Sequence, residues 1–569
     1  MKTPIIQFKN FSFQYHAQSS PTLHNINLTI YQGEKILIVG PSGSGKSTLG
    51  HCLNGLIPFS YEGEIQGSLT LNNIETKTAS IFELSQHIGT VLQDSDGQFV
   101  GLNVAEDIAF ALENDNTNQT IMKQKVKDTA TLVSMDQWLD SNPFELSGGQ
   151  KQRAALAGAM VSDAHILLFD EPLANLDPAT GKKAIELIDK IHADGKTTII
   201  IEHRLEDVLH CPVDRIIVIN DGKIVMDDIP SKVLSSTILK DHGIREPLYL
   251  TACRYANIEI LPEMHPEHIQ SFDVSKVQSQ LQNWFGKQPS SQLQSPSTPL
   301  LKIQDLNFSY DGEHPILDHI SLQIHEGEMI SIVGKNGAGK STLSKLIVGF
   351  EKADSGLIEL AGTDLSSHTI KERSESIGIV LQNPNQMISK NLIFDEIAFG
   401  LRIRKITEAE IEKRVTKVMQ TCGLLPFKKW PISALSYGQK KRVTIAAILV
   451  LNPQILILDE PTAGQDFYHY SEIMNFLESL NKQGQTIILI THDMHLMLDY
   501  TPRAIVLAEG KKIADAKAYE VLCNLDLVEK ANLKETSLFE LALKANIDDP
   551  LRFINCFIAT EQGGRLHEN

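Results

Sequence analysis

The chain has 569 residues, enough for about three to five compact domains, which excludes a single small binding module. Hydrophobic residues make up 42% of it and charged residues 21%, a composition that is typical of folded globular proteins and excludes a disordered or fibrous chain. The net charge of −18 repels phosphate backbones, so we do not expect nonspecific nucleic-acid binding.

Cysteine usage and hydropathy indicate the compartment. The six cysteines include no C-x-x-C pair, which argues against a disulfide framework, a zinc site or an iron–sulfur site and indicates the reducing cytosol. The N-terminal segment lacks the apolar core of a signal peptide, and no apolar run approaches the ~20 residues needed to cross a bilayer. We therefore expect any action at a membrane to need another subunit that spans it.

The first landmark along the chain is a glycine-rich segment that occurs twice. Residues 40–48 read GPSGSGKST, and residues 334–342 read GKNGAGKST. Four later landmarks recur in the same order at one constant offset, which indicates a tandem duplication. These pairs are Gln93 and Gln382, Leu146 and Leu435, Asp170 and Asp459, and His203 and His492.

Short aliphatic runs predict the strands of each copy. Residues 36–39 lead into the first glycine-rich segment, and two further runs, 166–169 and 197–201, follow later in that copy. Continuous apolar runs of this length are typical of strands that are buried on both faces of a parallel sheet. The second copy repeats them at 329–333, 455–458 and 486–490. The sequence therefore predicts the α/β class twice over.

Gly-x-x-x-x-Gly-Lys-Ser between a buried strand and a helix predicts a phosphate-binding loop, or P-loop. The glycines let backbone N–H groups surround a β-phosphate, the lysine reaches the β- and γ-phosphate oxygens, and the serine hydroxyl ligates Mg²⁺. The predicted phosphate-binding residues are Gly40, Pro41, Ser42, Gly43, Ser44, Gly45, Lys46, Ser47 and Thr48 in the first copy, and Gly334, Lys335, Asn336, Gly337, Ala338, Gly339, Lys340, Ser341 and Thr342 in the second.

Polar residues at the carboxyl ends of the predicted strands complete a hydrolytic site. Asp170 and Glu171 follow one run at the edge of an open α/β sheet, where ligands bind. We expect the aspartate to hold Mg²⁺ through water and the glutamate to polarise the attacking water. A histidine after the next run can orient that water, and a glutamine amide can contact both Mg²⁺ and the water. The predicted catalytic residues are Glu171, His203, Glu460 and His492, and the predicted metal-contacting residues are Ser47, Gln93, Asp170, Ser341, Gln382 and Asp459.

Residues 146–150 read LSGGQ and precede a helical run, so small residues lie at a helix N-terminus that favours an anion. Because the P-loop of the same copy already holds a phosphate, we expect this segment to act on the nucleotide of the other copy, with the two halves paired face to face. The residues predicted to contact nucleotide in this way are Ser147 and Gly149 in the first copy, and Ser436 and Gly438 in the second.

The rest of the chain lies between and after the two copies. Residues 288–299 carry no charge and three prolines, which is typical of a semi-extended connector. The stretch before them forms either a small accessory fold or a structured spacer, and the spacing of Leu538, Leu541 and Leu543 predicts a helical tail. We expect one domain at 1–235, an accessory segment and linker at 236–300, a second domain at 301–525 and a tail at 526–569.

The ordered set of P-loop, glutamine, LSGGQ, Asp-Glu and histidine resembles the ATP-binding cassette (ABC) superfamily over both halves of the chain. The resemblance implies two tandem P-loop NTPase domains, each with a RecA-like core and a helical subdomain, and ATP hydrolysis with Mg²⁺. It also implies two composite ATP sites. These sites would combine Lys46, Asp170 and Glu171 with Ser436, and Lys340, Asp459 and Glu460 with Ser147, while Tyr15 and Tyr310 match the family's adenine-stacking aromatic residue and Asp177 and Asp466 match its D-loop.

A narrower resemblance lies after each of the two glutamines. The segments 93–110 and 382–401 resemble the ATPases of energy-coupling-factor transporters, which include cobalt-type importers. This implies import of a vitamin, a vitamin precursor or a metal ion, with an integral membrane coupling subunit and a substrate-binding membrane subunit as partners. The chain would be a peripheral protein on the cytoplasmic side of the cell membrane. Glu106, Asp107, Asp395 and Glu396 either meet basic residues of the coupling subunit or form a solvated helix face.

The second LSGGQ-like segment departs from the family pattern. It reads LSYGQ, so the bulky Tyr437 replaces a glycine and would be strained if that position needs a positive φ. Ser436, Gly438, Glu171 and His203 are all present, so we expect both sites to hydrolyse ATP, with rates that can differ.

The alternative function is that of a soluble double-cassette translation factor acting on ribosomes. That branch of the superfamily typically has a long, helical and basic connector. Here residues 241–300 hold four basic residues against six acidic ones, which does not suit an RNA contact. A tandem sugar-import ATPase is a third candidate, disfavoured by the two energy-coupling-factor-like segments.

Overall fold

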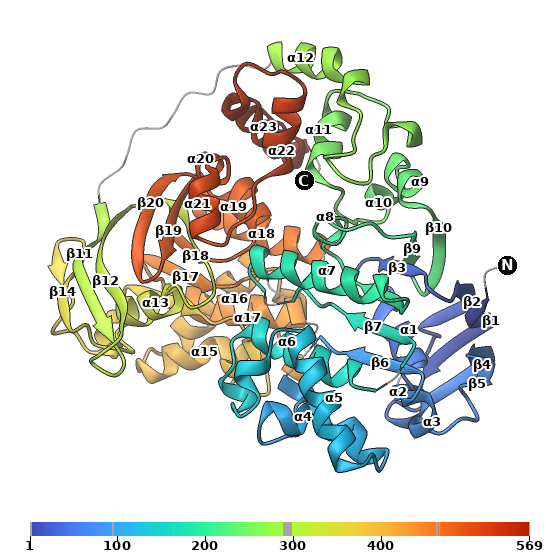
Figure 1. Ribbon diagram of the computed structural model, residues 1–569. Coiled ribbons are helices and arrows are strands. Elements are labelled where there is room, and N and C mark those ends of the chain that lie inside the picture. Colours follow the sequence, from blue (N-terminus) through green and yellow to red (C-terminus); the bar gives the residue numbers. More distant parts are fainter. Residues whose placement is uncertain are drawn as a thin grey trace. The chain divides into compact units, whose positions relative to one another are not determined.

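The computed structural model describes residues 3–16, 18–93, 96–162, 164–174, 176–287, 299–435, 437–462, 465 and 467–567 (Figure 1). Two residues singled out in the sequence, Ser436 and Asp466, lie outside the described residues, as does the predicted connector from 288 to 298. The chain divides into two compact units. The first holds Met1–Trp284, Asp466–Tyr468 and Lys544–Asn546, and the second holds Phe285–Gln465, His469–Leu543 and Ile547–Asn569.

The first unit is built around a six-stranded sheet. In order across it, the strands are β10 (Lys223–Asp228), β9 (Arg215–Asn220), β3 (Lys35–Val39), β8 (Thr197–Ile201), β7 (Ile166–Asp170) and β6 (Ile88–Val91). Neighbouring strands are parallel except for the edge pair β10–β9. Every residue of β3, β7 and β8 is buried, as their continuous apolar runs predict.

A second, four-stranded sheet covers the first one and is antiparallel. Phe8, Phe11 and Phe13 of this sheet are buried and pack in one core with Ile36 and Ile38 of β3, so the main apolar core lies between the two sheets. Its strands, in order, are β2 (Leu23–Tyr31), β1 (Pro4–Tyr15), β4 (Gly63–Leu71) and β5 (Ile74–Glu75).

Helices complete the first unit. A middle segment of helices, which contributes no strand to the sheets, forms the helical subdomain that the family resemblance implies (Figure 1). Asp177 caps α7 by accepting a hydrogen bond from the Thr180 N–H at 2.9 Å. The helices next to the sheets are α1 (Lys46–Leu53), α2 (Leu56–Phe59), α3 (Ile81–Ser85), α7 (Pro178–Ala193) and α8 (Leu205–Val208), and those of the subdomain are α4 (Val104–Asn114), α5 (Gln119–Leu132) and α6 (Gly148–Met160).

The second unit repeats this architecture. Its two sheets again enclose one apolar core, and its helical subdomain has a core of its own. The sheet strands, in order, are β16 (Ile377–Val380), β17 (Ile455–Asp459), β18 (Thr486–Ile490), β13 (Met329–Val333), β19 (Arg503–Ala508) and β20 (Lys511–Lys517), then β12 (Pro315–His325), β11 (Pro299–Ser309), β14 (Ser355–Leu360) and β15 (Thr363–Asp364). The helices are α13 (Lys340–Val348), α14 (Ile370–Arg373), α15 (Ile393–Ile403), α16 (Glu408–Thr421), α17 (Tyr437–Leu449), α18 (Phe467–Lys482) and α19 (Met494–Tyr500). The α/β class predicted for both copies is confirmed.

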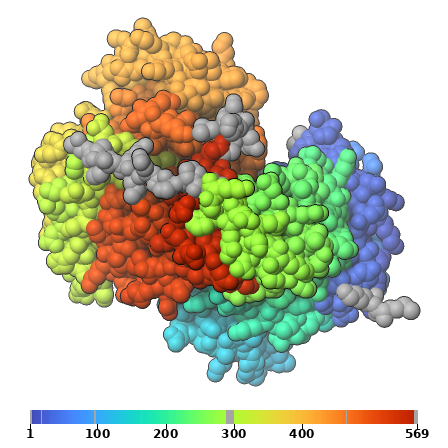
Figure 2. Space-filling model, turned by 90° about the horizontal axis from the view of Figure 1, so that it is seen from above, coloured from blue at the N-terminus to red at the C-terminus, as the bar shows by residue number. Residues whose placement is uncertain are grey.

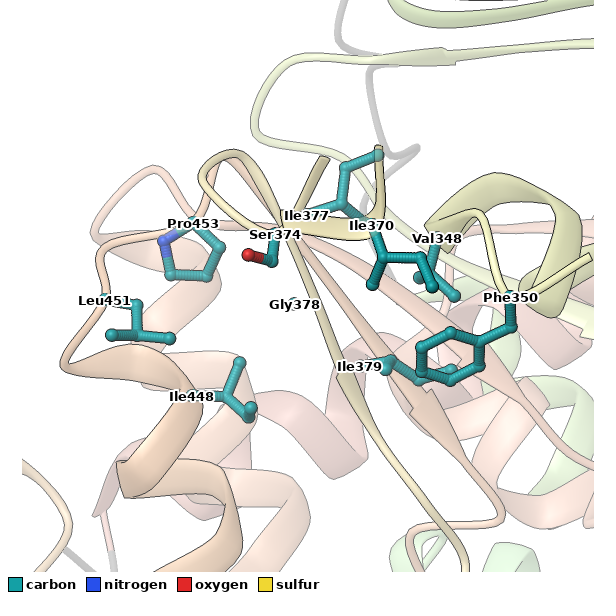
Figure 3. Close-up of a pocket in the computed structure, with 10 residues that line it drawn as sticks. All are labelled: Val348, Phe350, Ile370, Ser374, Ile377, Gly378, Ile379, Ile448, Leu451 and Pro453. Atoms are coloured by element: carbon teal, nitrogen blue, oxygen red, sulfur yellow. The ribbon is translucent and has the colours of Figure 1, made fainter. Parts of the chain in front are cut away.

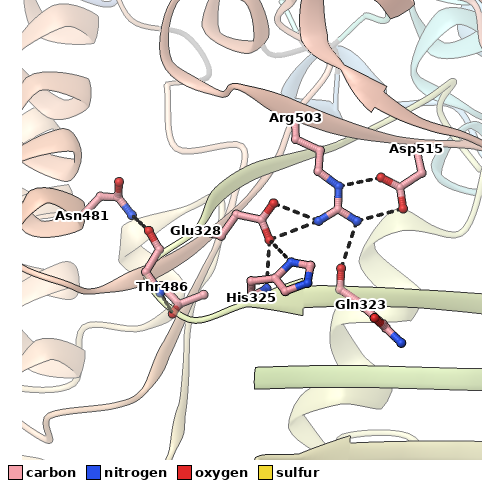
Figure 4. A network of polar contacts seen from close by, with 8 residues as sticks. Gln323, His325, Glu328, Asn481, Thr486, Arg503 and Asp515 are labelled. Atoms are coloured by element: carbon pink, nitrogen blue, oxygen red, sulfur yellow. Dashed lines mark hydrogen bonds and ion pairs between the residues drawn. The ribbon is translucent and has the colours of Figure 1, made fainter. Parts of the chain in front are cut away.

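A polar network ties the two sheets of the second unit together (Figure 4). The Arg503 guanidinium on β19 donates to Glu328 at 2.8 Å, to Asp515 of β20 at 2.6 Å and to the Gln323 carbonyl of β12 at 3.0 Å. Hydrogen bonds to charged groups of this kind stabilise a fold more than neutral ones. The first unit repeats the network with Arg215, Glu34 and Asp227 in place of Arg503, Glu328 and Asp515.

The stretch before the connector is folded and belongs to the first unit; it is drawn in green in Figure 2. Tyr249 and Phe272 are buried there, with their rings 5.6 Å apart, and the Tyr249 hydroxyl donates to the Pro266 carbonyl at 2.8 Å. The stretch is thus folded as part of the first unit, and the division at residue 235 stays a prediction. Its helices are α9 (Pro230–Ser235), α10 (Ile238–Asp241), α11 (Leu248–Tyr255) and α12 (Gln278–Gly286).

The tail is helical, as predicted. Leu538 and Leu541 are buried on one face of α22, whereas Leu543 is exposed. The tail helices are α20 (Ala518–Leu522), α21 (Leu525–Lys530), α22 (Ser537–Lys544) and α23 (Pro550–His567). No helix in the described ranges is both long and apolar enough to cross a membrane.

Candidate active sites

In both units the P-loop leads from a central strand into a helix: β3 into α1, and β13 into α13. Gly45 (φ 100°) and Gly339 (φ 94°) cap these helices in the left-handed region, which glycine adopts without a steric penalty. A Cβ on Gly40 would lie 2.2 Å from the Ile219 carbonyl oxygen, so only glycine lets the loop pass strand β9. Such loops bind phosphate with backbone N–H groups.

The P-loop lysines are held inside their loops. Lys46 is 7% exposed, and its ammonium donates to the Gly40 and Pro41 carbonyls, each at 2.8 Å. Lys340 makes the same contacts with the Gly334 and Lys335 carbonyls at 2.7 and 3.0 Å. Each of these two lysines therefore places a positive charge inside its loop, as a site for phosphate oxygens requires.

The predicted metal-contacting hydroxyl and aspartate meet at the start of the P-loop helix. The Ser47 hydroxyl lies 3.5 Å from Asp170, and the Ser341 hydroxyl lies 3.2 Å from Asp459. Burial raises the pKa of Asp170 to about 6, against the opposing effects of the Ser47 hydrogen bond and the Lys46 charge. Burial and then the charge of Glu460 raise the pKa of Asp459.

These oxygen donors fit Mg²⁺. A hydroxyl and one carboxylate are the protein ligands that Mg²⁺ typically takes beside phosphate oxygens and water. Across the described residues, no group of three or more His, Cys, Asp and Glu could hold a metal ion by itself. A divalent ion at Ser47 and Asp170 would complete its shell with water and with the phosphate oxygens of a bound nucleotide.

The glutamate after each aspartate has an unusual backbone. Glu171 (φ 50°) and Glu460 (φ 45°) are left-handed, and their N–H groups donate to the Ile201 and Ile490 carbonyls at 2.8 and 2.9 Å. A side chain in this region costs about 1–2 kcal/mol, and such strain concentrates at functional sites. The left-handed turn ends the strand and directs the chain out of the sheet. It was not foreseen from the sequence, because nothing in the local residue pattern requires it.

In the first unit, the surroundings of Glu171 include a second buried carboxylate. The Gln93 amide donates to Glu171, which brings these two predicted residues together. His203 Nδ1 lies 3.9 Å from Glu171 but only 3.2 Å from Glu202, which is fully buried. Burial, followed by the charges of Glu202 and Asp170, raises the pKa of Glu171 to about 8.

In the second unit, the glutamate contacts its histidine directly. His492 Nδ1 lies 2.7 Å from Glu460, and the Thr491 hydroxyl donates to Glu460 at 3.2 Å. Burial opposes ionisation of Glu460, but the charge and hydrogen bond of His492, together with Lys340 and Thr491, outweigh it and lower the pKa. Glu202 was not foreseen from the sequence, although it stands where the second copy has Thr491, a visible difference between the two copies.

Each predicted adenine-stacking tyrosine lies beside its P-loop helix. The Tyr15 hydroxyl is 3.1 Å from the Thr48 hydroxyl, and the Tyr310 hydroxyl is 3.4 Å from that of Thr342. Tyr15 is half-buried, whereas Tyr310 is 56% exposed and has the Lys345 ammonium over its ring, 6.0 Å from the centroid.

The LSGGQ segment starts the subdomain helix α6. Ser147 precedes this helix, its N–H donates to Gln150 at 2.8 Å, and Gly149 lies in the first turn. Helix α17 begins at Tyr437 in the same way, with Gly438 in its first turn. Since helical backbone has negative φ, the position does not need a positive φ and the strain considered for Tyr437 does not arise. The expected contact of Ser436 lies outside the described residues.

Two of the four acidic residues expected to face a partner or solvent are buried instead. Asp107 is 8% exposed, and its carboxylate accepts two N–H groups of the loop before α4 at 2.9 and 3.1 Å. Glu396 is 6% exposed and does the same before α15 at 2.8 and 2.6 Å. Both expectations for Asp107 and Glu396 are therefore wrong, because each side chain fixes its own loop. Glu106 is exposed, and Asp395 pairs with Arg402 at 2.9 Å.

Fold and site geometry together define a two-cassette P-loop nucleotide hydrolase. Comparisons with known sequences give the family. A family profile described as "ABC transporter" matches residues 23–174 and 317–463, and one described as "ATP-binding cassette cobalt transporter" matches residues 236–308. A profile described as an AAA domain, putative AbiEii toxin, matches residues 428–499, within the second cassette.

Curated relatives match the whole chain. Putative ABC transporter ATP-binding proteins are 57% identical in Clostridium perfringens and 56% identical in Enterococcus faecalis, covering 99% and 100% of both chains. The counterpart in Photobacterium profundum is 54% identical and covers 98% of this chain and 99% of its own. The chain therefore belongs to the ABC transporter ATP-binding proteins, a family of ATPases.

A solved structure is also similar. CbiO1 from Clostridium perfringens, described as part of the ABC transporter complex CbiONQ, is 38% identical over 41% of this chain and 94% of its own, with a TM-score of 0.38. The full-length relatives are named as transporter proteins, so the translation-factor alternative is not favoured.

Proposed function

We propose that this ATPase is the energy-coupling subunit of an importer for a vitamin, a vitamin precursor or a metal ion. The observation that carries the proposal is the pair of P-loop sites in a chain whose accessory region, residues 236–308, matches a cobalt transporter profile. The energy-coupling-factor-like segments after Gln93 and Gln382 support it. The chain would act as a peripheral protein on the cytoplasmic side of the cell membrane.

At each site, the residues would divide the work of ATP hydrolysis. In the first, the P-loop with Lys46 binds the phosphates, Ser47 and Asp170 hold Mg²⁺, and Glu171 polarises the water that attacks the γ-phosphorus while the bond to ADP breaks. His203 and Gln93 orient that water. Mg²⁺ neutralises charge that builds up on the phosphate oxygens. Lys340, Ser341, Asp459, Glu460, His492 and Gln382 repeat these roles, and Tyr15 and Tyr310 stack on the adenines.

The two cassettes would share their nucleotides. Each LSGGQ-like segment, with Ser147 or Ser436, completes the site of the opposite half, so ATP binding closes the pair and phosphate release reopens it. We place the cassettes at 1–235 and 301–525, with 236–300 and 526–569 as accessory parts. The covalent link keeps the two halves at high effective concentration.

A pocket of about 100 Å³ in the second unit is suited to a membrane partner (Figure 3). Its lining is almost wholly apolar and comes from the ends of α13 and α17, from α14 and from β16. Phe350 and Ile370 on its rim are each about half exposed. We assign it to an apolar side chain on a helix of the integral membrane coupling subunit. Strand β16 lines the pocket and leads directly to Gln382. A side chain bound in the pocket would therefore contact the strand that precedes this glutamine.

Affinity capture of the full chain from gently solubilised native membranes tests the proposal. We expect one or two small integral membrane proteins to come with it, and the substrate-binding one identifies the cargo. Ile370→Asp should release them, whereas Leu525→Asp, at a residue 61% exposed outside the pocket, should not. Recovery of ribosomes with no membrane protein would overturn the proposal.

A further inference from the structure

The backbone around the two predicted metal-contacting glutamines is held by different residues in the two copies. Gln98, which follows Gln93 in the first copy, stands where the second copy has Met387. Gln152, in the helix after LSGGQ, stands where the second copy has Lys441. The two differences go together, because Met387 and Lys441 contact the same backbone segment.

In the first copy, one side chain ties the backbone that leads to Gln93. The Gln98 amide oxygen accepts the Leu92 N–H at 3.1 Å, and its amide nitrogen donates to the Thr90 carbonyl at 3.1 Å. A glutamine can do both because its amide has an acceptor and a donor. Since Leu92 directly precedes Gln93, these two bonds hold the end of strand β6 and the start of the loop that follows it.

In the second copy, Met387 keeps only half of this arrangement. Its sulfur accepts the Leu381 N–H at 3.2 Å. A thioether is a weak acceptor and has no hydrogen to donate, so Met387 cannot bind a carbonyl of the same segment. A donor to the backbone around Gln382 must therefore come from outside the segment.

Lys441 of helix α17 supplies that donor. Its ammonium donates to the Leu381 and Gln382 carbonyls, both at 2.8 Å, and the side chain is fully buried. Burying an ammonium group is costly unless hydrogen bonds compensate for the lost water, and these two carbonyls provide them. The matching Gln152 instead donates to the Pro172 carbonyl, which belongs to a different turn.

We propose that Lys441 is the positioning residue for Gln382, as Gln98 is for Gln93. The Gln382 side chain is exposed, so the place of its amide is set by the backbone from which it extends. Lys441 fixes that backbone by holding the carbonyl of Gln382 itself. Without the lysine, ATP still binds, but the amide is no longer held beside the attacking water. A misplacement of about 1 Å at such a group can slow a reaction by about 100-fold.

The inference rests on the proposed role of Gln382 and is independent of the transported cargo. Steady-state ATPase kinetics of the purified full chain test it, with Glu171→Gln to silence the first site. We expect Lys441→Gln to lower the kcat of the second site about tenfold and to change its KM less than about twofold. Gln382→Ala should cause a loss of similar size, and the two substitutions together should lower kcat no further.

The arrangement of the first copy supplies a rescue. Met387→Gln, added to Lys441→Gln, places glutamine at both positions and should restore kcat to within about threefold of the Glu171→Gln parent. The charges of Asp459 and Glu460 act on Lys441, so the single substitution also removes a cation near them. Rescue by an uncharged glutamine separates the lost hydrogen bonds from the lost charge.

The first copy allows the reverse exchange, which tests the inference even if Lys441→Gln does not fold. In a Glu460→Gln chain, Gln98→Met should lower the kcat of the first site about tenfold. Added Gln152→Lys supplies the ammonium at the position of Lys441 and should restore most of that loss.

Hydrogen exchange of the nucleotide-free chain measures the backbone itself, without hydrolysis. Lys441→Gln should speed exchange of the amides of residues 381–383 about tenfold, and added Met387→Gln should reverse this. Arg442→Gln is the matched control. It removes the neighbouring cation of the same helix, which pairs with Glu472 at 3.2 Å, and should leave these amides unchanged.

The outcomes separate the two proposals. An unchanged kcat for Lys441→Gln, a loss that adds to that of Gln382→Ala, or a loss that Met387→Gln does not rescue would overturn the inference. Unchanged exchange at residues 381–383 would do the same. A full rate for Gln382→Ala would overturn the proposed role of that glutamine as well. Failure of the importer proposal in membranes would leave these results standing.

Discussion

The two cassettes agree around the predicted phosphates and differ around the glutamate that follows the acidic strand. Lys46 and Lys340 make the same two loop contacts, and both glutamates are left-handed. His492, however, lies 2.7 Å from its glutamate, whereas His203 lies 3.9 Å from Glu171 and closer to Glu202. The P-loop contacts have thus stayed the same in the two copies, whereas the surroundings of Glu171 and Glu460 have diverged.

The largest expected effect tests whether both sites hydrolyse ATP at all. Glu171→Gln and Glu460→Gln each remove the carboxylate that polarises the water, so each should lower the steady-state ATPase rate of the full chain at least about twofold. The double substitution should lower it at least about 100-fold. If either single substitution leaves the rate unchanged, only one of the two sites hydrolyses ATP.

The histidines should show how far the two sites have diverged. In a Glu171→Gln chain, His492→Ala should lower the remaining ATPase rate by about tenfold, because His492 contacts Glu460 directly. In a Glu460→Gln chain, His203→Ala should lower it by only about threefold, because His203 is held by Glu202. Equal losses would mean that the contact distances do not govern catalysis.

The arginine networks should behave alike in both units. Arg503→Met removes charged hydrogen bonds to Glu328 and Asp515 and should cost about 2 kcal/mol of stability, which lowers the melting temperature by about 5 °C. Arg215→Met should have a similar effect on the first unit. Calorimetry of the full chain measures both. A large difference between them would show that the sheets are not tied together in the same way.

The smallest effect is expected for Tyr437, where the second LSGGQ-like segment departs from the family pattern. Tyr437→Gly restores the family residue at a position whose backbone is already helical, so no strain is relieved. We expect the ATPase rate of the full chain to change by less than about twofold. Ser147→Ala removes a proposed nucleotide contact and serves for comparison. It should lower the rate by more than Tyr437→Gly changes it. A large gain in rate for Tyr437→Gly would instead show that the tyrosine slows hydrolysis at one of the two ATP sites.

The strands and P-loops could be predicted because their signals are local. Aliphatic runs of four or five residues and the spacing of Gly, Lys and Ser determine where strand, loop and helix follow one another. The contacts of Ser47 with Asp170 and of Gln93 with Glu171 follow from parallel strands that end at one edge of the sheet.

The rest depends on contacts between distant segments. Asp107 is part of a sequence that looks like an exposed acidic helix face, yet the preceding loop folds over it and buries it. Glu202 is surrounded by amides from two strand ends, which no local pattern shows. The left-handed turn of Glu171 likewise follows from its N–H contact with β8.

The number of ATP molecules bound per chain tests the central claim most directly. A Glu171→Gln/Glu460→Gln chain should bind ATP without hydrolysing it, so equilibrium dialysis with radiolabelled ATP in saturating Mg²⁺ counts the sites. We predict two ATP molecules per chain. One molecule or none would contradict the claim that both cassettes carry a complete nucleotide site.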